Sequence, residues 1–142
     1  MTLFEMLAQT TAANPAAPAL QFHDHVLTYG ELTALAERFA GGLAALITGK
    51  RPCVGVLLPN CPQFAIAYYG ASRAGATVVP MNVLYRPDEA RYILADAEAE
   101  VLITAEPFRP LVQALLPHLP GLKAVVMVTL GLGACAMACP IL

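Results

Sequence analysis

The chain has 142 residues, 58% of them hydrophobic and 13% charged, with a formal net charge of −2 at pH 7. This length fits one domain with a buried core, and the apolar excess indicates that part of the surface packs against further protein. The near-neutral charge, with no basic stripe and no interleaving of basic and aromatic residues, argues against a nucleic-acid partner.

The N-terminal segment favours a cytoplasmic location. Residues Met1 to Thr10 contain Glu5 and no Lys or Arg before the apolar run, unlike a secretory signal or a transit peptide. The cysteines form no C-x-x-C pair and do not lie at ligand spacing from the histidines, so we expect reduced thiols and no metal site. These residues are Cys53, Cys61, Cys135, Cys139, His23, His25 and His118.

The beginning of the chain predicts a helix and a hairpin. Apolar residues at helical spacing predict an amphipathic helix over Leu3–Asn14, which ends before Pro15. Short apolar runs follow at Ala19–Phe22 and His25–Leu27, and a polar His-Asp pair separates them. Two such runs are typical of a small β-hairpin.

A long helix and a buried strand are expected next. Thr28 and Glu31 have the spacing of a capping box, in which a hydroxyl and a carboxylate satisfy amide groups at a helix start. Apolar residues then recur at steps of three and four as far as Ile47, which indicates an amphipathic helix. The continuous apolar run Cys53–Leu58, ended by Pro59, predicts a strand covered on both faces.

A further helix and strand complete a βαβ unit. Asn60 and Gln63 resemble a second capping box. The segment from there to Ala74 is apolar nearly all round, which predicts a largely buried helix with Gly75 as its left-handed cap. Thr77–Val79 is the next predicted strand, and short crossovers of this kind join parallel strands.

Helices and strands continue to alternate toward the C-terminus. A helix is predicted from Pro87, followed by a core strand at Val101–Thr104. A weak helix at Leu111–Leu116 and a strand at Ala124–Val128 complete the series. The alternation predicts an α/β fold with a layered parallel sheet.

The tail differs from the rest, because Ala124–Leu142 contains no charged residue. Its length and hydropathy approach those of a membrane span, but Gly131, Gly133 and Pro140 interrupt it and no aromatic belt flanks it. We therefore expect no transmembrane span and an irregular apolar tail over residues 130–142. An out-of-frame end that is not native to the fold is an alternative.

Three short motifs resemble nucleotide or catalytic sites but lack the necessary context. Residues 131–136 match the dinucleotide-binding pattern G-x-G-x-x-A, yet no helix and no ribose-binding acid follow them. Ser72 lies in a near match to G-x-S-x-G, but within a predicted helix and not at a strand-to-helix turn. Gly49 and Lys50 resemble the end of a P-loop, but Arg51 replaces its Ser or Thr. We expect a helical serine and a solvated lysine.

The carboxylates on the helix from Pro87 and at its exit could include an acid/base pair. A solvated face is expected instead, with Asp88 and Glu89 stabilising the positive end of the helix. The others are Asp96, Glu98 and Glu100.

Seven short motifs follow one another along the chain in a recognisable order. They are Pro18 to Leu20, Leu27 to Leu32, Gly55 to Phe64, Arg73 to Ala76, Val79 to Asn82, Tyr85 to Glu89 and Val101 to Thr104. Together they resemble the N-terminal region of the acyl-CoA synthetase, luciferase and peptide-synthetase adenylation superfamily, over about Leu3 to Val128. The stretches around Pro59 and Asn82 most resemble fatty-acyl and related CoA ligases. Residues 1–129 would then be a partial N-terminal subdomain of the acyl-CoA synthetase-like fold.

The resemblance implies that a complete enzyme uses ATP and magnesium to convert a carboxylic acid to an acyl-adenylate, which the thiol of coenzyme A then attacks. The family's phosphate loop ending in Pro-Lys-Gly, its adenine and ribose motifs and its catalytic lysine have no match here. No catalytic residue, metal ligand or cofactor is therefore assigned to this chain. Arg86 is the one residue that we place near a nucleotide or CoA phosphate, and only in a complete enzyme; a surface arginine before a helix is the alternative.

These observations leave three hypotheses. The first is an inactive fragment of an acid–CoA ligase, whose partners are a carboxylic acid, with fatty acids favoured, and the remainder of the ligase fold; a fragment of a peptide-synthetase adenylation domain is the nearest competitor. The second is a non-catalytic α/β module that binds a partner through its apolar surface. The third is a minimal nucleotide-binding domain that uses Gly131 and Gly133.

Overall fold

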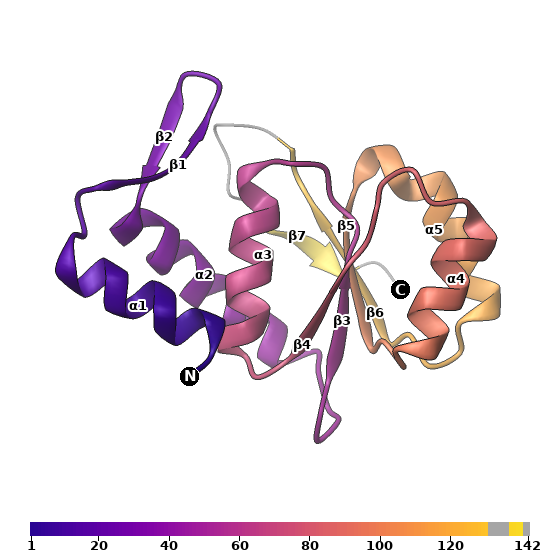
Figure 1. Cartoon of the computed structure of the whole chain (residues 1–142). Helices are drawn as coiled ribbons and strands as arrows, with labels where there is room; N and C mark the ends of the chain where they lie inside the picture. The colour runs from indigo at the N-terminus through magenta and orange to yellow at the C-terminus, as the bar shows by residue number, and fades with distance from the viewer. Residues whose placement is uncertain (131–136, 141–142) are drawn as a thin grey trace.

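A mainly parallel sheet forms the centre of the chain in a computed structural model that describes residues 1–130 and 137–140 (Figure 1). The strand order is β4-β3-β5-β6-β7, with the first four strands parallel and β7 antiparallel to β6. The strands are β3 (Cys53–Val56), β4 (Thr77–Pro80), β5 (Val101–Ala105), β6 (Ala124–Val128) and β7 (Met137–Pro140). The prediction of parallel strands in one sheet is confirmed.

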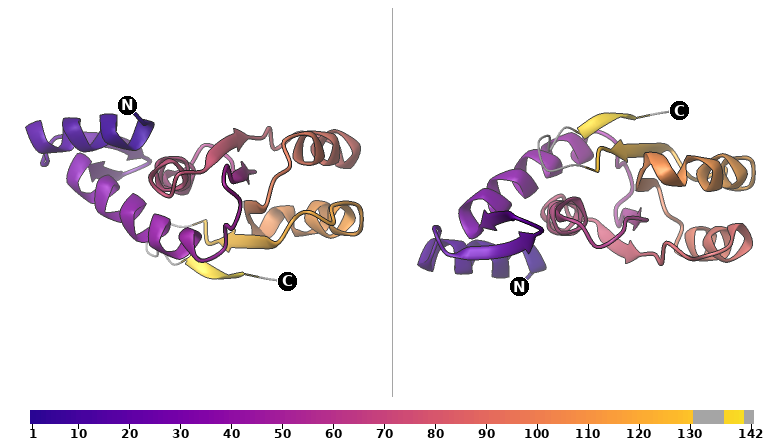
Figure 2. Two further views of the ribbon diagram at one scale, coloured as in Figure 1. Left: turned by 90° about the horizontal axis from the view of Figure 1, so that it is seen from below. Right: turned by 90° about the horizontal axis from the view of Figure 1, so that it is seen from above.

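Helices cover both faces of this sheet, which gives three layers (Figure 2). One face carries α1 (Leu3–Ala13), α2 (Tyr29–Ala44) and α3 (Pro62–Arg73), and the other carries α4 (Pro87–Asp96) and α5 (Arg109–Leu115). Short 3₁₀ turns, Glu106–Phe108 and Leu116–His118, flank α5. The predicted hairpin is also present, formed by β1 (Pro18–Phe22) and β2 (His25–Thr28), and it projects beyond α2 (Figure 1).

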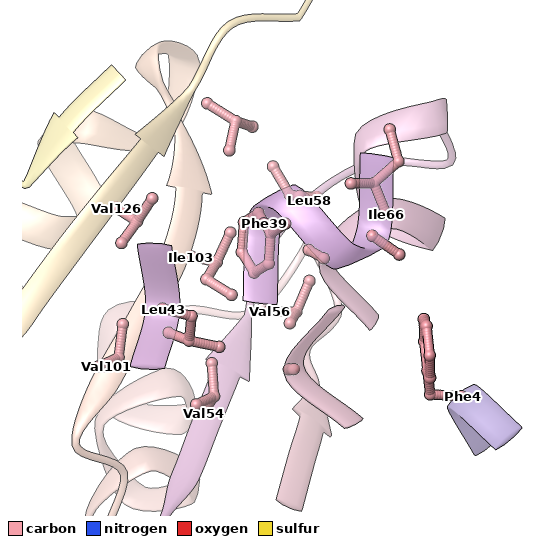
Figure 3. Packing of buried hydrophobic residues seen from close by; sticks show 14 of the residues in the cluster. Phe4, Phe39, Leu43, Val54, Val56, Leu58, Ile66, Val101, Ile103 and Val126 are labelled. Carbon is pink, nitrogen blue, oxygen red and sulfur yellow. The ribbon is translucent and has the colours of Figure 1, made fainter. Parts of the chain in front are cut away.

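The alternation of side chains along each strand divides the core in two. On β5, Val101 and Ile103 point toward α1–α3, whereas Leu102 points toward α4 and α5. Figure 3 shows the first of these clusters, in which Phe39 and Leu43 of α2 lie over the strands. Because both faces are buried, β3, β5 and β6 read as continuous apolar runs.

The two predicted capping boxes have different outcomes. At α2 the prediction is confirmed, since Glu31 N donates to Thr28 Oγ1 over 3.2 Å and Thr28 N donates to Glu31 Oε2 over 2.8 Å. At α3 it is wrong, because the helix begins at Pro62 and Cys61 makes no side-chain cap. Proline presets the helical φ and has no N–H to satisfy, so this helix start needs less capping.

The end of α3 follows the expectation from sequence. Gly75 has a φ of 81°, in the left-handed region that a helix-terminating glycine favours. Ser72 is within the helix, and its Oγ accepts a hydrogen bond from Phe4 N over 3.4 Å. Ser72 therefore lies on a helix, as predicted, and not at the strand-to-helix turn on which a catalytic serine of this motif is found.

Part of the tail takes a regular form. Residues 137–140 pair with β6 as β7, which an irregular tail would not do, whereas residues 131–136 and the dinucleotide-like motif lie outside the described part of the chain. The division into a subdomain over 1–129 and a tail over 130–142 stays a prediction. Within residues 1–130 and 137–140, no helix is both long enough and apolar enough to cross a membrane.

Candidate functional site

The carboxyl ends of the parallel strands define the candidate site. Because β3, β4, β5 and β6 are parallel, the loops that leave them lie at one edge of the sheet, at the top of Figure 1. In open α/β sheets, ligands bind in the crevice outside this edge. The N-termini of α3 and α4 also lie there, and helix N-termini favour negatively charged groups.

The connection from β3 to α3 is fixed by burial. Leu57 and Leu58 are 0% and 3% exposed, and Leu57 N donates to Ile103 O over 2.8 Å. Cys61 follows as the N-cap of α3 and is half-buried. Burial raises the pKa of its thiol, so Cys61 stays protonated at neutral pH and is a poor nucleophile.

The connection from β4 to α4 carries Arg86, the residue singled out from sequence. Asn82 Oδ1 accepts a hydrogen bond from Leu84 N over 2.9 Å, which shapes the loop. Arg86 N donates to Glu89 Oε2 over 2.8 Å at the helix start. The Arg86 side chain is 76% exposed, and its Nε lies 3.4 Å from Asp88 Oδ1. Arg86 therefore lies at the carboxyl edge, with a carboxylate as its present partner.

The connection from β5 to α5 holds a second arginine that the sequence did not single out. Arg109 Nε and Nη2 donate to the two oxygens of Glu106 over 2.6 and 2.7 Å, a two-pronged pair at the surface. Arg109 holds the pKa of Glu106 below its usual range. Beside the pair, a hollow of about 290 Å³ is lined by Glu106, Pro107, Met127, Val128, Thr129 and Leu130.

The end of β6 is tied to α3. Gln63, predicted to help cap α3, instead donates from Nε2 to Thr129 O over 3.0 Å. This bond joins segments that are 66 residues apart in the chain. Hydrogen bonds thus connect the segments that follow β3 and β6 and tie the β3–α3 connection to β5 at the carboxyl edge.

The opposite edge of the sheet holds both lysines of the chain. Lys50 is exposed in the loop between α2 and β3, as predicted, and Lys123 directly precedes β6. Both lysines therefore lie before the amino ends of strands, at the end of the sheet away from the carboxyl edge. Glu100 also lies at this opposite edge, directly before β5, and the prediction that it is solvated is wrong: its side chain is 12% exposed and accepts hydrogen bonds from the α2–β3 loop.

The carboxyl edge therefore carries two guanidinium groups, each paired with a carboxylate of this chain, together with the N-termini of α3 and α4, which favour anions. Among the residues that the structure describes, no three His, Cys, Asp or Glu side chains gather as a metal site. The predicted Arg86 is placed at this edge, whereas Ser72 and Lys50 lie away from it. The Glu106–Arg109 pair at spacing i,i+3 on a helix start is a signal that sequence reasoning could have used.

Known proteins resemble this chain in sequence. The AMP-binding enzyme family matches residues 7–136. A long-chain-fatty-acid–CoA ligase of Bacillus subtilis is 38% identical over 105 residues, which are 74% of this chain and 19% of that protein. Tyrocidine synthase 3 of Brevibacillus parabrevis is 29% identical over 102 residues, which are 72% of this chain and 2% of that protein.

A solved structure shows the same arrangement of helices and strands. The anthranilate CoA ligase AuaEII, crystallised with anthranoyl-AMP, superposes with a TM-score of 0.84 and 27% identity. The match covers 90% of this chain and 25% of that protein, so the chain spans about a quarter or less of the relatives compared here. Since the family match covers most of the chain and the fold agrees with it, this chain belongs to the AMP-binding enzyme family.

Proposed function

We propose that this chain is the N-terminal part of an ATP-dependent carboxylic acid–CoA ligase that acts on fatty acids. The observation that carries the proposal is the match to AMP-binding enzymes over residues 7–136, with a long-chain-fatty-acid–CoA ligase among the relatives. In the complete enzyme, a carboxylate oxygen attacks the α-phosphorus of ATP and pyrophosphate leaves. The CoA thiolate then attacks the acyl carbon, and AMP leaves.

The part of the reaction that this chain supports is positioning. Its sheet and helices would hold one wall of the crevice, while the phosphate loop, the magnesium ligands and the catalytic lysine come from elsewhere in the enzyme. Arg86 is proposed to lie near a nucleotide or CoA phosphate there, because it occupies the carboxyl edge beside the positive end of α4. Its exchange of Asp88 for a phosphate would keep the guanidinium paired.

A second candidate is supported by the similarity to tyrocidine synthase 3. In this case the complete protein would adenylate an amino acid. The acceptor thiol distinguishes the two candidates, since a CoA ligase releases a soluble thioester. A cytoplasmic location stays a prediction under both.

Two experiments test the proposal. Sequencing the DNA downstream, in all frames, should find a segment rich in Ser, Thr and Gly that ends in Pro-Lys-Gly. In addition, residues 1–128 can replace the corresponding part of the Bacillus subtilis ligase, with that ligase itself as the positive control. The chimera should form acyl-CoA from ATP, CoA and a long-chain fatty acid.

The results separate the candidates. A folded chimera without acyl-CoA formation would contradict the proposed ligase. Downstream DNA that encodes a carrier-protein segment with an attachment serine would favour the amino-acid-activating candidate. A chimera whose activity falls when Arg86 is replaced by alanine, with KM for CoA or ATP raised more than kcat is lowered, would support a phosphate contact.

A further inference from the structure

Glu100 directly precedes β5, at the amino end of the sheet and opposite the candidate site, and its carboxylate lies in a polar cradle. The amino ends of the parallel strands are at the bottom of Figure 1. Glu100 Oε2 accepts from Thr48 N over 2.9 Å, and its Oε1 accepts from Gly49 N over 3.0 Å. The Thr48 hydroxyl also donates to Oε2, over 3.3 Å. Both carboxylate oxygens are therefore held by consecutive backbone N–H groups.

Lys123 completes the cradle with a positive charge. Its Nζ lies 3.0 Å from Glu100 Oε2 and also donates to the Thr48 hydroxyl. Successive backbone N–H groups that point to one spot form an anion-binding concavity, and an ammonium group strengthens it. The donors come from two parts of the chain that are 75 residues apart, so the cradle is built by the fold.

Gly49 is required by the shape of this cradle. A Cβ atom at position 49 would overlap Glu100 Oε1, because the carboxylate approaches the backbone closely. The cradle and its occupant thus fit each other tightly. Its donor set suits a small planar anion with two oxygens: Thr48 N donates to one oxygen, and Gly49 N donates to the other and, over a longer 3.3 Å, to the first as well.

We propose that Thr48, Gly49 and Lys123 form a binding site for one carboxylate group, which the chain fills with its own Glu100. The site holds the α2–β3 loop against the start of β5 and β6. When the Glu100 side chain is removed, the cradle takes a small free carboxylate such as formate in its place. The Lys123 side chain is 48% exposed, which gives such an anion a path from solvent.

Rescue of a Glu100→Ala variant of the 142-residue chain by sodium formate tests this site. The variant should have a lower Tm than the wild type, and formate should raise it by about 3 °C in a saturable way. Sodium chloride at equal ionic strength should not reproduce this rise. In ¹H–¹⁵N spectra, formate should shift the amide signals of Thr48 and Gly49 in the variant and leave them unchanged in the wild type.

Matched variants make the result decisive. Asp96→Ala removes an exposed carboxylate four residues earlier in the sequence and should show no specific response to formate. Adding Lys123→Met to Glu100→Ala should weaken the rescue, because the charge of the cradle is lost. Equal effects of formate and chloride on Glu100→Ala would overturn the proposal. If Glu100→Ala is unfolded in chloride, failure of formate to restore a cooperative transition would overturn it as well.

Discussion

Glu100 is kept as an anion by its neighbours. The hydrogen bond from Thr48 N and the Lys123 side chain lower its pKa from the ordinary value of a glutamate. A group with a lowered pKa in the folded state stabilises the fold above its unfolded pKa, about 4.3 for glutamate. This stabilisation is lost as the pH falls through the folded pKa.

The pH dependence of a Glu100→Gln variant follows from this sign. At pH 7 the variant should be less stable by about 1–2 kcal/mol, because hydrogen bonds to a charged group are lost. The difference from the wild type should shrink as the pH falls below about 4.3, because the unfolded wild-type chain then takes up a proton at Glu100 that the folded chain takes up only at lower pH. Urea unfolding between pH 3 and pH 7 measures it, with Asp96→Asn as the control. A difference that stays constant over this range would contradict the prediction.

At the scale of elements, the contact between α2 and α3 depends on one glycine. A Cβ atom at Gly70 would lie 2.6 Å from Phe39 Cδ1 and 2.9 Å from Ala36 O. The carbonyl belongs to the backbone of α2, so a rotamer change cannot relieve the overlap. The absence of a side chain at this position therefore lets the two helices pack closely.

A Gly70→Ala variant should lower the free energy of unfolding by about 1–3 kcal/mol, since the helices must separate to admit the methyl group. Gly42→Ala is the matched control, because a Cβ atom there meets nothing within 4 Å and position 42 lies within α2. That control should be stabilised by about 0.5–1 kcal/mol, the helix preference of Ala over Gly. Thermal unfolding of both variants measures these changes in stability. Equal shifts of Tm in the two variants would show that Gly70 has no packing role.

The outer edge of β4 is protected by Pro80. Thr77 N donates to Pro52 O, and Met81 N donates to Val56 O of β3. Because successive backbone N–H groups of a strand point in opposite directions, the N–H of Val78 and the nitrogen of residue 80 point away from β3. Proline at position 80 removes one of these outward donors, which is a common protection of sheet edges.

A Pro80→Val variant should associate more than the wild type, because it restores an outward N–H group on an edge strand. Sedimentation velocity over a range of concentrations would measure this. Pro87→Val is a useful control, since that proline begins α4 and lies outside the sheet. The edge argument fails if Pro80→Val and the wild type sediment alike at all concentrations.

At the scale of the whole molecule, local patterns predicted most of the architecture. The apolar runs at 101–104 and 124–128 lie in buried strands, and the run at 53–58 forms a buried strand over Cys53–Val56, followed by two buried leucines outside it. The Thr28 capping box begins α2 as expected. These features depend on neighbours in sequence or on burial, both of which leave a periodic or continuous apolar pattern. The family motifs then indicated the fold that the comparisons show.

Contacts between distant segments were not predictable in this way. From their residue types and sequence neighbours, Glu100 was predicted to be solvated and Gln63 to cap a helix locally. In the structure, Glu100 accepts a hydrogen bond from a loop 52 residues away, and Gln63 donates to a carbonyl 66 residues away. At the carboxyl edge, Arg86 was found through the resemblance, whereas Arg109 was missed. In the sequence, the pairing of Arg109 with Glu106 appears only as an i,i+3 spacing, and ordinary surface ion pairs on helices have the same spacing.

The distribution of charge over the molecule leads to a last prediction, that the 142-residue chain alone does not catalyse ATP–pyrophosphate exchange. Adenylate formation requires donors and a metal ion around the triphosphate, where charge develops in the transition state. At the carboxyl edge, Arg86 and Arg109 are already paired with carboxylates, and both lysines lie at the other end of the sheet.

ATP binding should therefore be no tighter than about 1 mM, which corresponds to about −4 kcal/mol. Isotope exchange with labelled pyrophosphate should stay at background with fatty, aromatic and short-chain acids, while the Bacillus subtilis ligase gives a signal with long-chain acids under the same conditions. Calorimetric titration with Mg-ATP measures the affinity independently. Exchange above background that is lost in Arg86→Ala or Arg109→Ala would mean that the carboxyl edge is a working site in this chain, because those substitutions leave the buried core of the sheet intact.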